Sequence, residues 1–365
     1  MTSTKTTRNP SSIELIRQLS SARGAPGFED EVLDAARPFI DSQTVRTESD
    51  SLRNLYLYRS QNSGDRPVIM LDGHSDEVGF MIQSVTREGM LKIMPLGGWA
   101  PQTVLAQKVA VRSASGKWIP GLVAAKPPHF MKESEKSSAV NIEDMVIDVG
   151  AVSAEEITDV FGIEPGAPVV PHADFEYNSD TGVMLGKAFD NRLGCAAVLE
   201  TLTRLSDAEL AVDVVGVFSS QEEAGLRGAK VATRKVQPQA AIVFEGAPAD
   251  DFHGNPEARQ GVLKKGPQIR HADRSMIANP RFTRFARETA QMNQVLFQDA
   301  VRTSGGTDGG SIHLSGAGIP TIVISVPVRY IHSPYGFAAL ADFEHAVDWC
   351  EAILKRIKPE DITSF

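Results

Sequence analysis

The chain has 365 residues, of which 42% are hydrophobic and 23% charged, with a formal net charge of −9 at pH 7. This composition is typical of a folded globular protein and excludes a disordered or collagen-like chain. The acidic balance and the lack of a dense Lys/Arg cluster argue against a nucleic-acid partner, because a phosphate backbone would be repelled. A chain of this length predicts two domains, or one domain with a large insertion.

The cysteines and the N-terminal segment indicate the cellular compartment in which the protein is expected. Cys195 and Cys350 are too few for a disulfide framework, and neither belongs to a Cys-x-x-Cys pair. Residues 1–12 are polar and lack the apolar stretch of a secretory signal, and no run of about 18 apolar residues occurs in the chain. We therefore expect a cytoplasmic protein that is neither secreted nor membrane-spanning.

The first half of the chain predicts two helices, two strands and then a β-rich segment. Apolar residues recur at helical spacing over 12–19 and 29–39, and a loop with Gly and Pro separates the two stretches. Strand-like runs follow at 54–59 and 67–71. From about 81 to 174 the pattern changes to short alternating runs broken by Gly and Pro, which indicates a small β-rich domain.

After residue 180, apolar strands alternate with helical stretches. The strands are expected at 212–218, 240–244 and 321–326, and the helices at 192–205, 280–294 and 342–356. This alternation predicts a parallel sheet covered by helices. The simplest fold is an α/β domain formed by residues 1–80 and 175–365, interrupted by the β-rich domain at 81–174.

Metal-binding side chains follow the predicted strands at five places. They are His74, Asp190, the pair Glu222 and Glu223, Glu245 and His332. Ligands of open parallel sheets bind at the carboxyl ends of the strands, so we expect these side chains to converge. Singly, each has a simpler explanation: Asp190 as a helix N-cap, the paired glutamates as solvated acids and a lone histidine as a surface residue. Their shared position favours a common site.

The set suits two divalent ions. Such a pair needs a bridging carboxylate, terminal histidine and carboxylate ligands, and an open position for water. The adjacent carboxylates of Glu222 and Glu223 face different ways, so one can bind metal while the other serves as a general base. Asp76 follows His74 by two residues, points to the same side of an extended segment, and is suited to orient the His74 ring.

The chain resembles the tetrahedral (TET-type) aminopeptidases, which include glutamyl and deblocking aminopeptidases. The motifs that carry the resemblance are LDGHSDEVG at 71–79, GKAFDNRLG at 186–194, SQEEAGLRG at 220–228 and RYIHSP at 329–334, with weaker support from PLGGW at 95–99 and GGTD at 305–308. The match spans roughly residues 12–356. It implies a zinc-exopeptidase-like α/β fold whose inserted, barrel-like domain mediates oligomerisation, with dimers assembling into a hollow tetrahedral homododecamer.

The resemblance also implies the ligands of each metal ion. Asp190 would bridge the two ions, with His74 and Glu245 completing one site and Glu223 and His332 the other. Zinc and cobalt are the expected metals, with manganese as a third candidate. Many family members carry Asp where Glu245 stands, a larger apolar residue at Ser75 and Ala at Gly309, and we expect these departures to tune the site.

The implied activity is removal of the N-terminal residue from short peptides through a metal-activated water. Glu222 would act as the general base and Asp76 would orient His74. Asp308, on a glycine-rich loop that can approach a ligand closely, is a candidate for shaping the substrate pocket, and a turn residue explains it equally well. The sequence does not select which N-terminal side chain is preferred.

Three alternatives stay open. A carboxypeptidase or an N-acyl amino acid deacylase of the same architecture would share the ions and differ in the substrate pocket. A glycoside hydrolase could use Glu222 and Glu245 as acid and base, but it leaves the histidines without a role. A non-catalytic metal-binding assembly protein would keep the cage without the chemistry, but it requires neither Glu222 nor Asp76.

Overall fold

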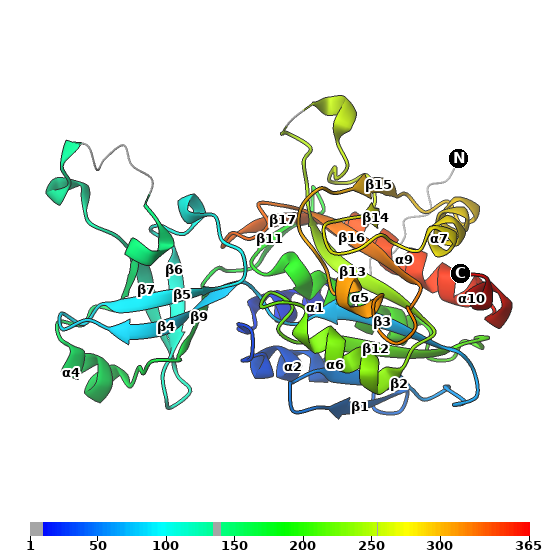
Figure 1. Cartoon of the computed structure of the whole chain (residues 1–365), viewed down its shortest axis with the longest axis horizontal. Helices are drawn as coiled ribbons and strands as arrows, with labels where there is room; N and C mark the ends of the chain where they lie inside the picture. The colour runs from blue at the N-terminus through cyan, green and yellow to red at the C-terminus, as the bar shows by residue number, and fades with distance from the viewer. Residues whose placement is uncertain (1–9, 134–139, 254) are drawn as a thin grey trace.

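The structure is a computed structural model that describes residues 10–133, 140–253 and 255–365. It consists of a large α/β body and a smaller β-barrel that stands to one side of it (Figure 1). Part of the segment from which the lack of a secretory signal was argued, residues 1–9, lies outside the described residues. Among the residues that are described, no helix combines the length and the apolar character that crossing a membrane requires.

The large body is built on a mixed sheet of 11 strands. Its order is β1 (Val45–Ser49), β2 (Leu55–Arg59), β12 (Asp213–Ser219), β3 (Val68–His74), β13 (Ala240–Pro248), β16 (Thr321–Arg329), β17 (Gly336–Ala339), β11 (Val183–Gly186) and β10 (Glu176–Asn178), with β14 (Gln268–Ala272) beside β16 and β15 (Gln298–Val301) beside β14. The central strands β12, β3, β13 and β16 run parallel, and β2 and β17 join them antiparallel.

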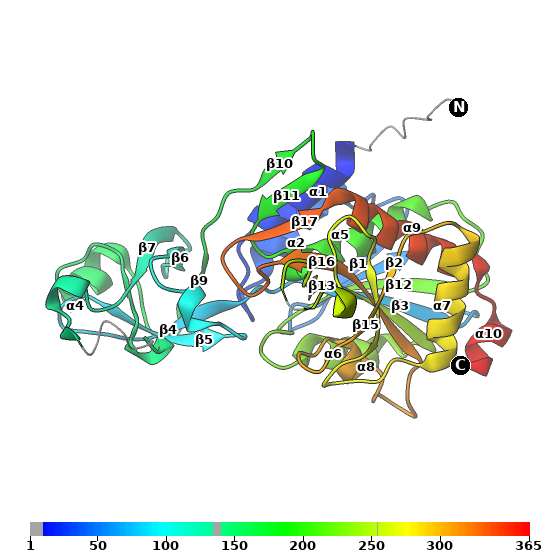
Figure 2. The ribbon, with the colours of Figure 1, turned by 90° about the horizontal axis from the view of Figure 1, so that it is seen from above.

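Helices cover both faces of this sheet. They are α1 (Pro10–Ser21), α2 (Asp30–Ala36), α5 (Phe189–Arg204), α6 (Arg227–Val236), α7 (Pro280–Met292), α8 (Gly309–Ile312), α9 (Leu340–Arg356) and α10 (Pro359–Ser364). Alternate residues of the central strands face opposite cores: Ile69 and Leu71 of β3 pack with α1, α5 and α9, whereas Met70 packs with α6 and α8. Figure 2 shows the two helical layers on either side of the strands. Burial on both faces explains why these strands read as continuous apolar runs.

The barrel is closed and has its own hydrophobic core. Its strands, in spatial order, are β4 (Gly79–Val85), β5 (Leu91–Leu96), β8 (Val146–Asp148), β7 (Trp118–Ala124), β6 (Lys108–Arg112) and β9 (Pro168–Pro171), and the short helix α4 (Ala154–Glu156) packs outside them. Strand β4 follows β3 directly, so the chain enters the barrel from the edge of the large sheet that carries His74. The α/β fold with an inserted β-barrel, expected from the sequence, is confirmed.

Some predicted elements were wrong in extent. The strand expected at 240–244 continues to Pro248, so Glu245 lies inside β13 and not beyond it. The α-helix expected at 29–39 ends at Ala36, and a 3-10 turn follows because Pro38 has no amide hydrogen to continue the helix. Strands β1, β14 and β15 were not predicted. Four of the five residues of β1 are exposed, which leaves no apolar run to recognise.

Candidate active site

The candidate residues converge at one edge of the sheet. His74 is the last residue of β3, Glu222 and Glu223 lie in the loop after β12, Glu245 lies in the second half of β13, and His332 lies in the loop after β16. Asp190 follows β11, which runs in the same direction as β16 because both pair antiparallel with β17. Because these strands end at the same edge, they deliver side chains from distant segments to one place.

Asp190 stands between the two histidines. Its Oδ1 lies 3.1 Å from Nε2 of His74, and its Oδ2 lies 3.2 Å from Nε2 of His332. Glu245 Oε1 is 3.4 Å from His74 Nε2, and Glu223 Oε1 is 3.5 Å from His332 Nε2. The structure therefore forms two groups of donor atoms that share one carboxylate. We call these five residues, together with Glu222, the His/carboxylate cluster.

The backbone around Asp190 is fixed by close packing against β13. Asp190 has non-helical dihedral angles at the start of α5, and Ala188 occupies the N-cap position. The side chain of Asn191 donates to the carbonyl of Phe244 at 2.8 Å. A Cβ on Gly246 would lie 2.8 Å from the Asp190 Cα, so only glycine allows this approach. These contacts hold Asp190 beside Glu245.

The barrel contributes one side of the site through the glycines of its PLGGW motif. A Cβ on Gly98 would lie 3.3 Å from Nδ1 of His332, and one on Gly97 would lie 2.9 Å from Oε2 of Glu223. Gly97 also has a φ of +87°, a conformation that favours glycine. The two glycines of the motif therefore allow the barrel to approach the cluster closely.

Asp76 is fully buried and makes two kinds of contact. Its Oδ1 lies 3.4 Å from Nδ1 of His74, and its own carbonyl oxygen lies 3.2 Å from the same nitrogen. Its carboxylate also accepts the backbone N–H groups of Glu222 and Glu223, both at 3.0 Å. The second contact was not anticipated from the sequence. It places Asp76 under the loop that carries both glutamates as well as beside the His74 ring.

Asp308 lies beneath the cluster. It is 1% exposed, and its Oδ2 accepts a hydrogen bond from Ser219 Oγ at 2.7 Å. Ser219 Oγ also contacts the buried carboxyl of Asp72. Asp308 does not belong to the described residues that line the cavity. Its position therefore favours a structural contact over the substrate contact considered from the sequence.

A cavity of about 740 Å³ opens onto the cluster. Its walls include all six cluster residues, Gly98 and Thr103 from the barrel side, and residues 304–306. This volume lies in the range of small-ligand sites. Two residues that the sequence did not single out, Arg270 and Arg302, also line the cavity. Arg270 is the middle residue of the unpredicted strand β14, and Arg302 directly follows β15. Both strands run opposite to β16, so the rule that places ligands at the carboxyl ends of parallel strands could not have located these two residues.

Crowding of carboxylates dominates the electrostatics of the cluster. Burial and mutual repulsion raise the pKa of Glu222 well above its ordinary value, and those of Glu223 and Glu245 to about 8. Burial lowers the pKa of His74, but the attraction of Glu222 and Glu245 and the hydrogen bonds with Asp190 and Asp76 together raise it by more, so the net shift is upward. For Asp190 the hydrogen bonds from both histidines outweigh burial and lower the pKa.

The donor set fits divalent cations. Glu223 Oε1 and Glu245 Oε2 are buried without a hydrogen-bond partner, although buried carboxylate oxygens are normally paired. Two groups of imidazole and carboxylate donors lie within 4.8 Å of one another, one made by His74, Asp190 and Glu223 and the other by His74, Glu222 and Glu245. His332 belongs to neither group, but its Nε2 lies 3.2 Å from Asp190 Oδ2. Zinc, cobalt and manganese all accept these ligand types. A cation here would satisfy the unpaired oxygens and relieve the repulsion between carboxylates.

An α/β sheet with a His/carboxylate cluster at its strand ends and an inserted barrel defines the class of the TET-like exopeptidases. A family model confirms this assignment. The chain belongs to the family described as M42 glutamyl aminopeptidase, whose model matches residues 54–349.

Relatives and solved structures agree with the family over nearly the whole chain. The glutamyl aminopeptidase of Lactococcus lactis subsp. cremoris is 32% identical, covering 95% of this chain and 97% of the relative. The lysyl aminopeptidase of Pyrococcus furiosus is 29% identical, covering 96% and 99%. The TET aminopeptidase of a marine-sediment Thaumarchaeota archaeon superposes with a TM-score of 0.92 at 37% identity, covering 98% and 99%. The TET1 peptidase of Pyrococcus horikoshii, which can assemble into a tetrahedron or a large octahedral shell, superposes with 0.85 at 28% identity, covering 95% and 100%. The resemblance inferred from the motifs is confirmed, and the chain is an aminopeptidase.

Proposed function

We propose that the chain is a two-metal aminopeptidase. His74, Glu245 and Asp190 hold one divalent cation, and Asp190, Glu223 and His332 hold the other. The observation that carries this proposal is the position of Asp190, whose two oxygens face the two histidines at 3.1 and 3.2 Å. Zinc or cobalt is the proposed metal, with manganese as a third candidate. When bound, such a pair supplies a water molecule of lowered pKa and polarises the scissile carbonyl.

Glu222 is the proposed general base. It lines the cavity, its Oε2 lies 3.9 Å from His74 Nε2, and the proposed ligand sets do not use its carboxylate. Its backbone is fixed by Asp76, so the carboxylate is held at the edge of the cluster. From there it can take a proton from the attacking water and deliver it to the leaving amine.

The test is release of free amino acids from unblocked and N-acetylated dipeptides. Protein treated with a chelator is compared with protein resupplied with zinc, cobalt or manganese. Metal-restored cleavage of the unblocked peptides alone is the expected result. Cleavage of the acetylated set would instead identify a deacylase or carboxypeptidase, and metal binding without cleavage of either set would identify a non-catalytic assembly protein.

The cavity wall favours an acidic first residue. Two divalent cations balance the four carboxylates of the cluster, so the remaining wall decides the local charge. Apart from the cluster, the charged residues among the described lining are Arg270 and Arg302. Both have a buried Nε–H without a hydrogen-bond partner, so each guanidinium has a donor that no other group of the chain uses. We propose that they attract a glutamate or aspartate side chain at the N-terminus of the peptide.

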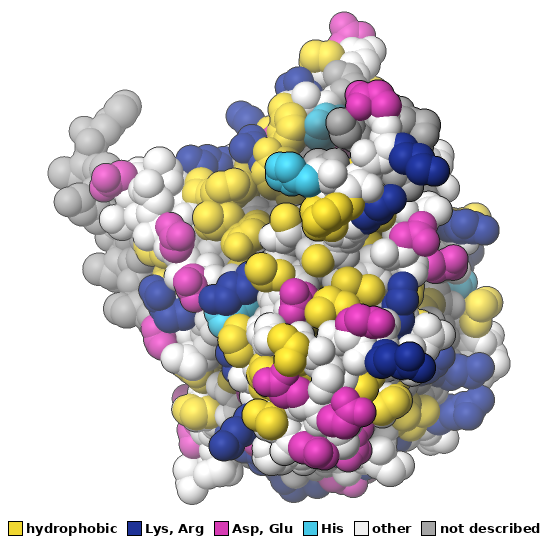
Figure 3. All heavy atoms as spheres, turned by 90° about the vertical axis from the view of Figure 1, so that its left-hand side faces the viewer, with side chains coloured by type: hydrophobic (Ala, Val, Ile, Leu, Met, Phe, Trp, Pro, Cys, Tyr) yellow, Lys and Arg dark blue, Asp and Glu magenta, His cyan; other side chains and the backbone are white. Residues whose placement is uncertain are grey.

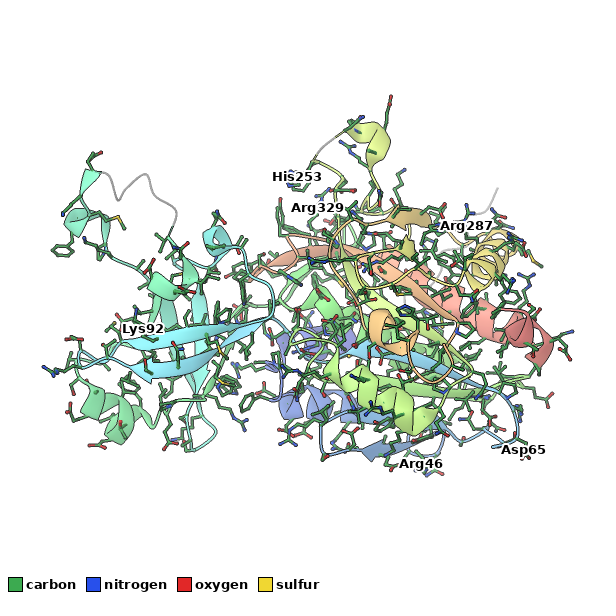
Figure 4. All side chains as sticks on the ribbon, viewed as in Figure 1. Arg46, Asp65, Lys92, His253, Arg287 and Arg329 are labelled. Atoms are coloured by element: carbon green, nitrogen blue, oxygen red, sulfur yellow. The ribbon has the colours of Figure 1, made fainter. Side chains whose placement is uncertain are left out.

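Existing ion pairs leave this role open to the arginines. Arg270 donates through Nη1 to Asp273 at 3.0 Å. Arg302 donates through Nη1 to Asp250 at 3.2 Å and through Nη2 to the Pro248 carbonyl and to Gln268 Oε1, both at 3.0 Å, which leaves its Nε–H unused. The other described arginines do not line the cavity. Arg287, for example, belongs to α7 and pairs with Asp299 on the surface (Figure 4). The lysyl and glutamyl relatives differ in the substrate that their names state, so the proposed preference rests on the arginines.

We also propose that the chain self-associates through the barrel into a tetrahedral homododecamer. The barrel exposes large apolar side chains that a monomer would leave in water, namely Leu122, Phe130, Val152 and Val160. Figure 3, which looks at the barrel end, shows hydrophobic side chains gathered in patches between charged ones. The mass in solution tests this proposal: a dodecamer supports it, and a monomer or isolated dimer contradicts it. A cytoplasmic location stays a prediction.

A further inference from the structure

The loop that carries Glu222 is held in an uncommon conformation. Gln221 has a φ of +53°, which residues other than glycine rarely adopt. Three consecutive backbone N–H groups of this loop donate to buried carboxylates. Those of Glu222 and Glu223 donate to Asp76, and that of Gln221 donates to Glu29 Oε1 at 3.1 Å. Two carboxylates from separate segments thus hold one short stretch of backbone.

Glu29 is an unusual residue to find in this place. It is fully buried, Oε1 accepts a second hydrogen bond from the N–H of Gly27 at 2.7 Å, and Oε2 has no partner. Among the described residues, no Lys, Arg or His side chain forms an ion pair with Glu29. Burial is the main cause that raises its pKa to about 7, and the negative charge of Asp76 adds to the shift. Burying a carboxylate in this way is costly. The position therefore calls for a reason.

Helix capping is not the reason. Glu29 occupies the N-cap position of α2, but its side chain makes no capping hydrogen bond to that helix. It turns instead to Gln221, which lies 192 positions further along the chain. The segment that carries Glu29 is itself anchored, because Gly24 and Glu77 exchange a pair of hydrogen bonds at 2.9 and 3.1 Å. Glu29 is thus a fixed point against which the loop is held.

We propose that Glu29 is a positioning residue for the general base Glu222. It fixes the Gln221 peptide in its left-handed conformation, and this conformation directs the next side chain into the cavity. Asp76 holds the amides of both Glu222 and Glu223, so loss of the Glu29 contact frees only the Gln221 peptide that precedes them. Glu222 is bonded directly to Gln221 and shifts with it, whereas Glu223 lies one residue further on and keeps its place as a metal ligand. This inference rests on the proposed function of Glu222 and adds a residue from the N-terminal segment to its support.

The experiment compares Glu29→Ala, Glu29→Gln and the matched control Asp30→Ala. Asp30 is the neighbouring acid in the first turn of α2, and it pairs with Arg53 on the surface. Steady-state kcat and KM are measured on an unblocked Glu dipeptide, with metal content and the visible spectrum of the cobalt-loaded protein. For Glu29→Ala we expect kcat to fall by about tenfold to a hundredfold, the cost of misplacing a catalytic group by about 1 Å. KM, metal content and the cobalt spectrum should stay those of the wild type.

Glu29→Gln keeps an acceptor oxygen at the same distance and should restore kcat to within about threefold of the wild type, since the neutral amide still accepts the Gln221 N–H. The control Asp30→Ala should match the wild type. If Glu29→Ala does not fold, Glu29→Asp replaces it, because the shorter side chain cannot reach the Gln221 amide and should lower kcat alike.

Three outcomes would overturn the inference alone: an unchanged kcat in Glu29→Ala, a loss of kcat that Glu29→Gln does not rescue, or a loss that comes with a changed cobalt spectrum. A wild type without metal-dependent turnover would overturn the proposed function, and the inference with it.

Discussion

The two halves of the His/carboxylate cluster are held in different ways. His74 and Glu245 lie on adjacent parallel strands, and the His74 side chain is 2% exposed. His332 and Glu223 lie on loops, the His332 side chain is 38% exposed, and its φ is +54°. The first half is therefore strand-held and enclosed, whereas in the second half the His332 side chain is open to the cavity, although Glu223 is as buried as Glu245. We infer that the strand-held half anchors the site and that the loop-held half admits substrate and exchanging metal.

The largest expected effect on kcat comes from replacing Glu222, which neither half of the cluster needs to bind its metal ion. Glu222→Gln removes the proton acceptor and keeps the shape of the side chain. We expect kcat to fall by about 10²- to 10⁴-fold, the usual contribution of a general base. Metal content, measured by elemental analysis, should equal that of the wild type. Normal turnover in this variant would remove Glu222 as the base.

Histidine replacement tests the difference between the halves directly. His332→Ala should lose the cation of the loop-held half and keep the other, because Asp190, His74 and Glu245 remain in place. His74→Ala should lower the content of both cations and also the stability, because it leaves the buried oxygens of Asp190 and Glu245 without the imidazole. Elemental analysis after dialysis and urea unfolding measure the two effects. Equal losses from the two variants would contradict the asymmetry.

The strand-held half is also the part that the sequence predicts best. His74 and Glu245 lie in strands of seven and nine residues, whose apolar parts at 68–71 and 240–244 are recognisable because both sheet faces are buried. Topology then brings their carboxyl ends together. The general fold follows from the same signal, while the domain limits at 81 and 174 and the individual roles of the cluster residues stay predictions.

Contacts that hold the loops could not be predicted. The bond from Gln221 to Glu29 depends on a positive φ and on two segments 192 positions apart, which periodicity does not reveal. Periodicity also does not reveal the hydrogen bonds that Asp76 accepts from two backbone N–H groups, or the burial of Asp308. Arg270 and Arg302 were not predicted as site residues, because β14 and β15 are short and mix polar with apolar residues.

The pH dependence of stability probes the support of the loop-held half. The pKa of Glu29 is raised from 4.5 to about 7 in the folded protein, so its stabilising contribution is complete below pH 4.5 and is lost as the pH rises through 7. Glu29→Gln does not titrate. In metal-free protein, the stability of Glu29→Gln relative to the wild type should therefore increase between pH 5 and 8, by about 3 kcal/mol at most. Urea unfolding at several pH values measures this, and a constant difference would contradict it.

The smallest expected effect concerns the arginines of the cavity wall, because they are proposed to select the first side chain of the peptide and have no part in the proposed chemistry. Arg302→Met removes one positive charge and keeps the length of the side chain. Its partner Asp250 is 27% exposed and can be hydrated, whereas Asp273, the partner of Arg270, is fully buried, so Arg302 is the safer position. We expect the ratio of kcat/KM for Glu dipeptides over Gln dipeptides to fall about tenfold, the value of one charge-assisted hydrogen bond.

Arg287→Met is the matched control for this comparison, because Arg287 pairs with Asp299 on the surface and does not line the cavity. It should leave the ratio unchanged. Because glutamate and glutamine differ in charge and hardly in size, the ratio isolates the electrostatic contribution of the wall from that of the cluster. If Arg302→Met keeps the wild-type ratio, Arg302 does not determine the preference for an acidic first residue. That result would not affect the proposed roles of the metal ligands and of Glu222, because both dipeptides would still be cleaved.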